Sequence, residues 1–226
     1  MKAPLYSLLL CLMLSACNGS HKNIPSTINL PEFPGFEIKA NSDFGSVKLS
    51  GYEYKSVDGK TVAYNTCAEA TNSKETEIAE YELFRYRLLI NSCHALKRYL
   101  AAKPSTDSFF PSQFDASLVR ELPATSVPLL NKTQEEARTG KTVNTYFANG
   151  QLSLEKNGSV KLQTVDDEII YTLLARGDLT NDGIEDLLVR TEWYARKASG
   201  KHVDLLVLSK TGQDKAVTIE WRLMSN

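Results

Sequence analysis

The feature that most constrains the fold is a series of closely spaced strand-like segments in the C-terminal part of the chain. From about residue 142 onward, apolar and polar residues alternate, and each segment ends at a short turn. Asn157-Gly158 separates the first two segments and is typical of a type I′ hairpin. The predicted strands are Leu152–Leu154, Val160–Leu162, Glu168–Ala175, Asp186–Tyr194, His202–Leu208 and Val217–Leu223. Because parallel strands need long crossovers, these short turns predict an antiparallel meander.

The longest helical signal precedes these strands and runs from about Ser73 to Lys103. Asn72 or Ser73 can cap its first turn, and Pro104 ends it. Apolar residues recur at spacings of three and four, which places them on one helix face. They are Tyr86, Leu89, Ile90, Cys93, Leu96 and Leu100. The sequence therefore predicts an amphipathic helix with one buried face.

A β-hairpin and a short helix are predicted ahead of this long helix. The hairpin covers Val47–Tyr64 and turns at Asp58-Gly59, a strong turn signal. Thr66 and Glu69 have the spacing of a capping box, which indicates that a short helix follows the hairpin directly.

The order of these elements indicates an α+β fold. A mixed hairpin and helical region occupies 41–140, and an antiparallel β region occupies 141–226; we expect 41–226 to form one domain. Within it, residues 104–140 combine several prolines with short helical pieces such as Asp115–Leu122. We expect that segment to run over the surface as a connector.

The four cysteines divide into two near the N-terminus and one later pair, Cys67 and Cys93. In an oxidising compartment such a pair favours a disulfide. A redox couple would be closer in sequence, as in C-x-x-C, and a zinc site would need further ligands. We therefore expect a Cys67–Cys93 disulfide that stabilises the helical N-terminal part.

The N-terminus has the layout of a secretory signal peptide. A basic Lys2 precedes the leucine-rich stretch Leu5–Leu14, which is shorter than the roughly 20 apolar residues that span a bilayer. Leu14-Ser15-Ala16-Cys17 resembles the lipobox of bacterial lipoproteins. The resemblance implies that residues 1–16 are removed and that Cys17 becomes the first mature residue and carries the lipid, palmitate included.

This resemblance also implies a location. Residues 17–40 are rich in Asn, Ser, Pro and Gly, a composition that favours an extended tether between lipid and domain. In Gram-negative lipoproteins, an aspartate after the lipidated cysteine retains the protein in the inner membrane. Asn18 occupies that position here, so we expect attachment to the outer membrane with the domain in the periplasm.

One loop between two predicted strands carries the residues of a cation site. Oxygen ligands alternate along it, and Gly183 permits the sharp turn that brings them together. Hard cations such as Ca²⁺ take six to eight such oxygens. The predicted metal ligands are Asp178, Thr180, Asp182, the carbonyl of Ile184, and Asp186.

The loop is similar to the EF-hand-like calcium loops of FG-GAP and related extracellular repeats, which read D-x-N-x-D-G-x-x-D-L. Thr180 replaces the usual Asn or Asp, and Val189 stands where a bidentate glutamate would, so we expect weak, structural calcium binding. The alternative is a plain hairpin turn at Asn181–Gly183 with solvated acids. The loop occurs once, which excludes a propeller of repeated blades.

Composition narrows the function classes. Twenty-six basic residues nearly balance 27 acidic ones, and no basic cluster indicates nucleic-acid binding. The sequence contains neither H-E-x-x-H nor G-x-S-x-G, so we expect no catalytic residues. The leading hypothesis is a non-enzymatic envelope lipoprotein that presents a surface to a protein partner, as an assembly accessory or a toxin-immunity protein. The alternative is a calcium-dependent cell-wall-active hydrolase or glycan-binding module.

Overall fold

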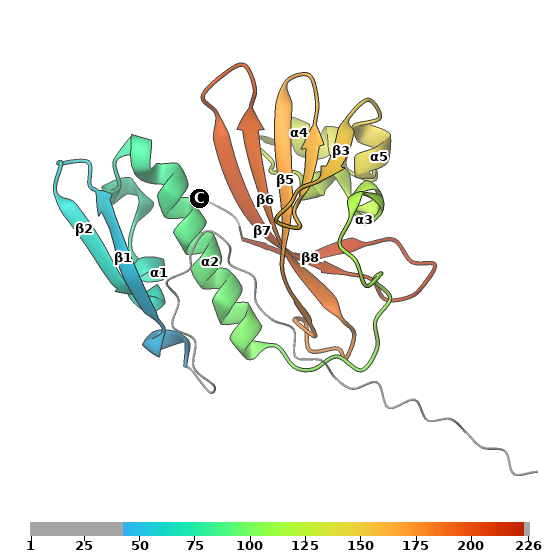
Figure 1. Cartoon of the computed structure of the whole chain (residues 1–226), viewed down its shortest axis with the longest axis horizontal. Helices are drawn as coiled ribbons and strands as arrows, with labels where there is room; N and C mark the ends of the chain where they lie inside the picture. Colours follow the sequence, from blue (N-terminus) through green and yellow to red (C-terminus); the bar gives the residue numbers. More distant parts are fainter. Residues whose placement is uncertain (1–42, 224–226) are drawn as a thin grey trace, which may run out of the picture.

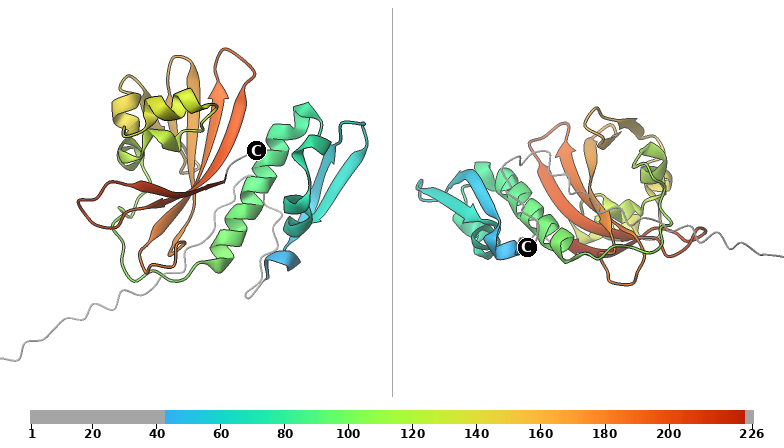
Figure 2. Two further views of the ribbon diagram at one scale, coloured as in Figure 1. Left: turned by 180° about the vertical axis from the view of Figure 1, so that it is seen from behind. Right: turned by 60° about the horizontal axis from the view of Figure 1, so that its bottom comes forward.

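Helix α2 (Leu83–Ala101) lies between a two-stranded sheet and a six-stranded sheet (Figures 1 and 2). The computed structural model describes residues 43–223, so the predictions for the leader, Cys17 and the tether lie outside the described residues. Within 43–223, no helix is both long enough and apolar enough to cross a membrane.

The predicted N-terminal hairpin is present. Strands β1 (Lys48–Lys55) and β2 (Thr61–Thr66) pair antiparallel, after the short turn η1 (Phe44–Ser46). The turn between the strands includes Gly59, whose φ of 80° lies in the left-handed region that glycine tolerates. Helix α1 (Cys67–Asn72) follows at once, and the Thr66 hydroxyl caps it by accepting the Glu69 N–H over 3.1 Å.

The long helix begins later than predicted, at Leu83 and not near Ser73. The backbone of residues 77–79 pairs with the hairpin instead, for example through the Ala79 N–H and the Lys55 carbonyl at 2.8 Å. This pairing with a distant strand overrides the local helical preference. Two short turns form there, η2 (Glu75–Glu77) and η3 (Glu80–Glu82).

The Cys67–Cys93 disulfide is present and joins α1 to α2, with the two Cα atoms 5.3 Å apart. Both cysteine side chains are fully buried. They belong to a core between the hairpin and α2 that includes Tyr54 and Tyr86, whose ring centres lie 5.8 Å apart. The disulfide therefore joins two elements of one packed layer.

The second sheet is the predicted antiparallel meander. Its six strands pair in chain order, each with the next, and the sheet is strongly twisted (Figure 1). The strands are β3 (Gln151–Leu154), β4 (Val160–Gln163), β5 (Asp167–Gly177), β6 (Asp186–Ala195), β7 (Lys201–Ser209) and β8 (Thr218–Leu223). The α+β fold expected from the sequence is thus confirmed.

Both faces of this sheet are covered, because alternate residues of a strand point to opposite faces. Helix α2 covers one face, and a layer of short helices covers the other (Figure 2). On β6, Leu188 belongs to the core beside α2, whereas Leu187 belongs to the core beneath the short helices. These short elements are α3 (Ala116–Glu121), η4 (Ala124–Ser126), α4 (Lys132–Arg138) and α5 (Val143–Tyr146).

The expectation of a surface connector over residues 104–140 is therefore wrong. Phe110, Phe114 and Leu122 from this segment are buried in the core beneath the short helices. This core lies on the face of the six-stranded sheet opposite α2, which we call the outer face. Burial of these apolar side chains stabilises the segment against the strands, although its prolines break it into short helices.

Candidate functional site

The predicted cation loop connects β5 to β6. Asp186 opens β6 opposite Gly177, the last residue of β5, and the intervening residues form a tight turn. Asp178 and Asp186 are buried, with 3% and 0% of their surface exposed. Two buried carboxylates in one loop need strong compensating contacts.

Asp186 obtains these contacts from four hydrogen-bond donors. Its Oδ2 accepts the Leu179 N–H, the Thr180 N–H and the Thr180 hydroxyl, each over 3.0 Å. Its Oδ1 accepts the hydroxyl of Ser209, the last residue of β7. Burial raises the pKa of Asp186, while the hydrogen bonds from Ser209, Thr180 and Leu179 act in the opposite direction.

Asp178 and Asp182 close the rest of the turn. The Asp178 carboxylate accepts the N–H groups of Asp182 and Gly183 over 3.0 and 3.1 Å. Asp182 in turn accepts the Ile184 N–H over 2.8 Å. Gly183 has a φ of 86°, so the glycine that the sequence singled out does make the turn.

Residues 103–108 hold this loop from outside, which the sequence did not indicate. Lys103 and Asp178 exchange backbone hydrogen bonds of 3.1 and 3.2 Å, and the Thr106 N–H donates to the Gly183 carbonyl over 2.8 Å. The Glu185 side chain pairs with Arg176 over 3.0 Å. All four acids of the loop therefore have partners within the protein.

The loop as arranged does not fit the calcium shell predicted from the sequence. Four donors already contact the Asp186 carboxylate, three at Oδ2 and one at Oδ1, so its charge is directed at protein donors instead of at an ion. Among residues 43–223, no group of three or more His, Cys, Asp or Glu side chains is gathered so that it could hold a metal. The predicted shell also contains the Thr180 hydroxyl and the Ile184 carbonyl, and calcium binding stays a prediction.

A second candidate site is a pocket of about 820 Å³ on the outer face of the sheet. It lies between α3, the start of α5 and the connection from β7 to β8. The lining includes the charged side chains Arg120, Glu121, Lys210, Asp214 and Lys215. These residues are far apart in the sequence, and no motif marks them, so sequence reasoning missed this site.

Lys210 differs from the other charged residues of the pocket. Only 9% of its surface is exposed, whereas the other four are exposed. It follows β7 directly and lines the pocket together with Ser117 and Arg120 of α3, so its side chain lies on the side of the short helices. Arg120 is held at the rim by a hydrogen bond of 3.2 Å to Asn144 Oδ1.

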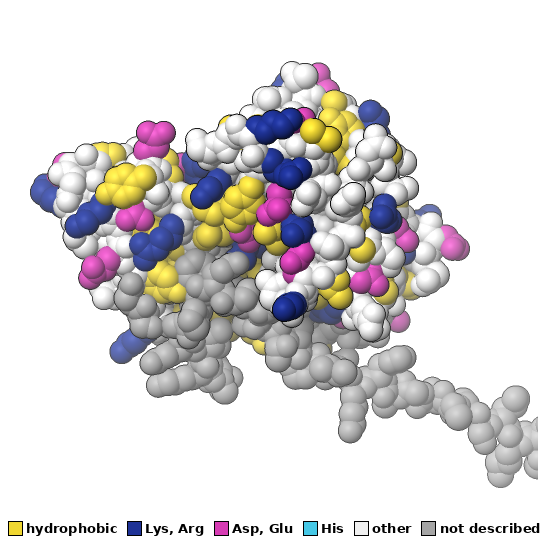
Figure 3. Space-filling model, turned by 45° about the horizontal axis from the view of Figure 1, so that its top comes forward, with side chains coloured by type: hydrophobic (Ala, Val, Ile, Leu, Met, Phe, Trp, Pro, Cys, Tyr) yellow, Lys and Arg dark blue, Asp and Glu magenta, His cyan; other side chains and the backbone are white. Residues whose placement is uncertain are grey.

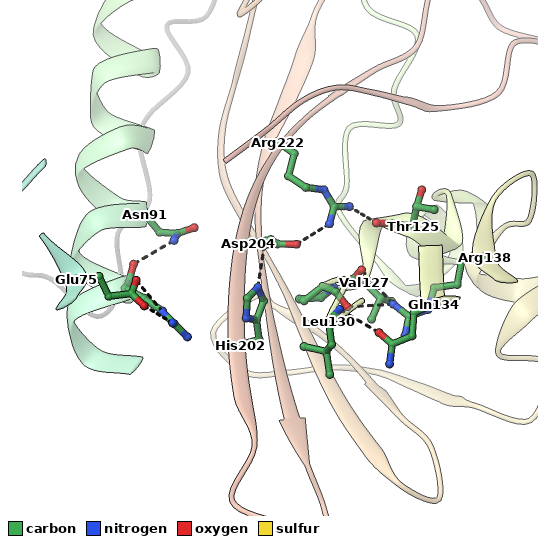
Figure 4. A network of polar contacts seen from close by, with 12 residues as sticks. Glu75, Asn91, Thr125, Val127, Leu130, Gln134, Arg138, His202, Asp204 and Arg222 are labelled. Carbon is green, nitrogen blue, oxygen red and sulfur yellow. Dashed lines mark hydrogen bonds and ion pairs between the residues drawn. The ribbon is translucent and has the colours of Figure 1, made fainter. Parts of the chain in front are cut away.

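A buried polar network lies beyond the pocket on the same face of the sheet (Figure 4). Asp204 on β7 pairs with Arg222 on β8 at 2.6 Å and with His202 at 3.3 Å. Arg222 also donates to the Thr125 carbonyl in η4. Burial lowers the pKa of Arg222, and the charge of Asp204 offsets this. The network fixes η4 to the sheet and serves packing.

The surface shows mixed charge. On the face in Figure 3, basic and acidic side chains are interspersed, with small apolar areas between them. Comparisons with protein-family models, with curated proteins and with solved structures found no match to this chain. Its function must therefore be inferred from its own residues.

Proposed function

We propose that this chain is an exported bacterial lipoprotein without enzymatic activity. It is anchored to the outer membrane through the lipid on Cys17 and presents its folded domain to a protein partner in the periplasm. The observation that carries the proposal is the Cys67–Cys93 disulfide between two fully buried cysteines. Disulfides persist in oxidising compartments and are rare in the cytosol, so the disulfide supports the export that the leader pattern indicates.

Two exposed apolar side chains on neighbouring segments support the proposal of a protein partner. Val57 follows Ser56, and Tyr81 lies in η3, three residues after Ile78; the Ser56–Ile78 bridge joins the two segments. Val57 and Tyr81 have 71% and 77% of their surface exposed. Exposed aromatic side chains frequently anchor protein–protein interfaces. The partner therefore docks on the outer side of the hairpin and η3.

Fractionation of cells that express the full-length chain tests the location. We expect the protein in the outer-membrane fraction with Cys67 and Cys93 resistant to alkylation until a reductant is added. Cys17→Ala should release it from the membrane, and Asn18→Asp should move it to the inner membrane. A wild-type chain that stays in the cytosol with free thiols would contradict the proposal.

Photocrosslinking in living cells tests the partner. A photoreactive amino acid at position 81 should give a discrete crosslinked species that contains one envelope protein. The matched control is position 165, because Val165 is also apolar and 72% exposed but lies in the β4–β5 turn. Equal crosslinking from both positions would contradict a specific surface. Hydrolysis of peptidoglycan by the wild type that Asp182→Ala abolishes would favour the enzymatic alternative.

A further inference from the structure

The pocket between α3 and the β7–β8 connection carries chemistry that the proposed function does not use. Its floor is apolar at Val217, which is 5% exposed and belongs to the core. Its walls carry hydroxyl, amide and charged groups. A cavity of about 820 Å³ is within the range of small-molecule sites.

The decisive residue is Lys210. It is more than nine-tenths buried and lines the pocket. Within residues 43–223, its ammonium group makes no hydrogen bond or ion pair, although Asp214 and Glu121 line the same pocket. The stem of Lys210 is buried, whereas its ammonium group is not among the fully buried atoms that lack a partner, so the charge opens into the pocket. An anion that enters the pocket would form a charge-assisted hydrogen bond with this unpaired ammonium group.

The neighbouring groups suit the same ligand. Arg120 and Lys215 add two cations at the rim, and the hydrogen bond from Arg120 to Asn144 holds the guanidinium in place. Three cations against two carboxylates leave the lining with one excess positive charge. A ligand with an oxyanion at one end and apolar atoms at the other would match Lys210 and the floor at Val217.

We propose that this pocket binds a small ligand through an oxyanion, a carboxylate or a phosphate, that pairs with Lys210. This pocket is separate from the lipid anchor and from the partner surface at Tyr81.

Ligand-dependent thermal unfolding of the full-length protein in detergent tests the site. Sodium acetate and inorganic phosphate are the probes, and sodium chloride keeps the ionic strength constant. We expect the melting temperature to rise saturably with at least one probe, as binding to the folded state requires. A response to acetate alone identifies a carboxylate ligand, and one to phosphate alone identifies a phosphate ligand.

Three variants connect the response to Lys210. Lys210→Met keeps the apolar stem and should weaken binding by about tenfold or more, the loss of a charge-assisted hydrogen bond. Arg120→Gln, at an exposed position, should also weaken it and serves if the first variant does not fold. Lys197→Met removes an exposed charge in the β6–β7 turn and should leave affinity unchanged. No saturable response in the wild type, or equal weakening by Lys197→Met, would overturn the proposal.

Discussion

Thr180 donates two hydrogen bonds to one oxygen of Asp186, from its backbone N–H and from its hydroxyl, each over 3.0 Å. The donor and the acceptor are six residues apart, so this contact closes the loop between β5 and β6 on itself. The hydrogen-bond donors around the Asp186 carboxylate replace the water molecules that it lost on burial. The carboxylate thereby holds the two ends of the loop together.

Asp186→Asn should therefore be strongly destabilising. The amide would present an N–H₂ group to donors that need an acceptor, and each hydrogen bond to the charged group would be weakened or lost. We expect a loss of about 2–4 kcal/mol in the free energy of unfolding, measured by urea denaturation. The matched control is Asp182→Asn, because exposed Asp182 accepts only the Ile184 N–H and should change stability by no more than about 0.5 kcal/mol. Equal effects of the two changes would contradict this role of Asp186 in the loop.

The same hydrogen bonds make a prediction about calcium. Because every acid of the loop has a partner in the protein, we expect EDTA to leave the melting temperature unchanged. If the shell predicted from the sequence forms, calcium at tenfold over its Kd would add about 1.4 kcal/mol, a rise of roughly 3–5 °C. Differential scanning calorimetry with EDTA and with millimolar calcium distinguishes the two cases. Such a rise that Asp182→Ala abolishes would show that the loop rearranges around the ion.

The disulfide between α1 and α2 should contribute much of the free energy of unfolding. Its cysteines are separated by 26 positions, and a loop of that length contributes about 3–3.5 kcal/mol in the chain-entropy model. The double variant Cys67→Ala/Cys93→Ala should lose about this amount in urea denaturation. A reductant should lower the urea midpoint of the wild type and leave that of the double variant unchanged. Similar midpoints for the two oxidised proteins would contradict this role.

Asp115 should give α3 a pH-dependent stability. Hydrogen bonds from the Ser117 hydroxyl and the Leu118 N–H lower the pKa of this carboxyl. Because the folded-state pKa lies below the unfolded value, the stabilisation is present above about pH 4 and is lost as the pH falls through the folded pKa.

Asp115→Ala should thus cost about 1 kcal/mol at pH 7, and the difference from the wild type should shrink below pH 4. Asp115→Asn keeps an acceptor that does not titrate, so its small effect should not depend on pH in this range. Urea denaturation from pH 3 to pH 7 measures both. A constant cost of the alanine variant across that range would contradict a role for the charge.

Local signals predicted the features that depend on neighbours in sequence. A turn does form at Asn157-Gly158, and Gly158 has a φ of 83°. The predicted type I′ is wrong, because that type needs a positive φ at both central residues and, among the described non-glycine residues, Asn181 alone has one. The Gly158 N–H donates to the Glu155 carbonyl, so the central residues of the turn are Lys156 and Asn157. The strand periodicity from β3 to β8 was similarly informative, because a period of two with short turns leaves few alternatives to a meander.

The features that the sequence did not predict correctly share one physical origin. They depend on contacts between residues that are distant in the chain. Helix α2 begins at Leu83 because residues 77–79 pair with residues 55–57, at and just after the end of β1. Phe110 and Phe114 stand in a proline-rich segment, and their burial depends on a sheet that forms from later residues. Lys210 follows a strand with no motif around it, and only the folded chain brings it beside α3.

Mass spectrometry of the N-terminal peptide tests the central claim, that this domain is a lipid-anchored envelope protein. The protein would be purified from membranes of cells that express the full-length chain, and digested. We expect the first residue to be Cys17 and its side chain to carry a lipid. An N-terminal peptide that begins at Met1, or one that begins after the leader without lipid, would contradict it.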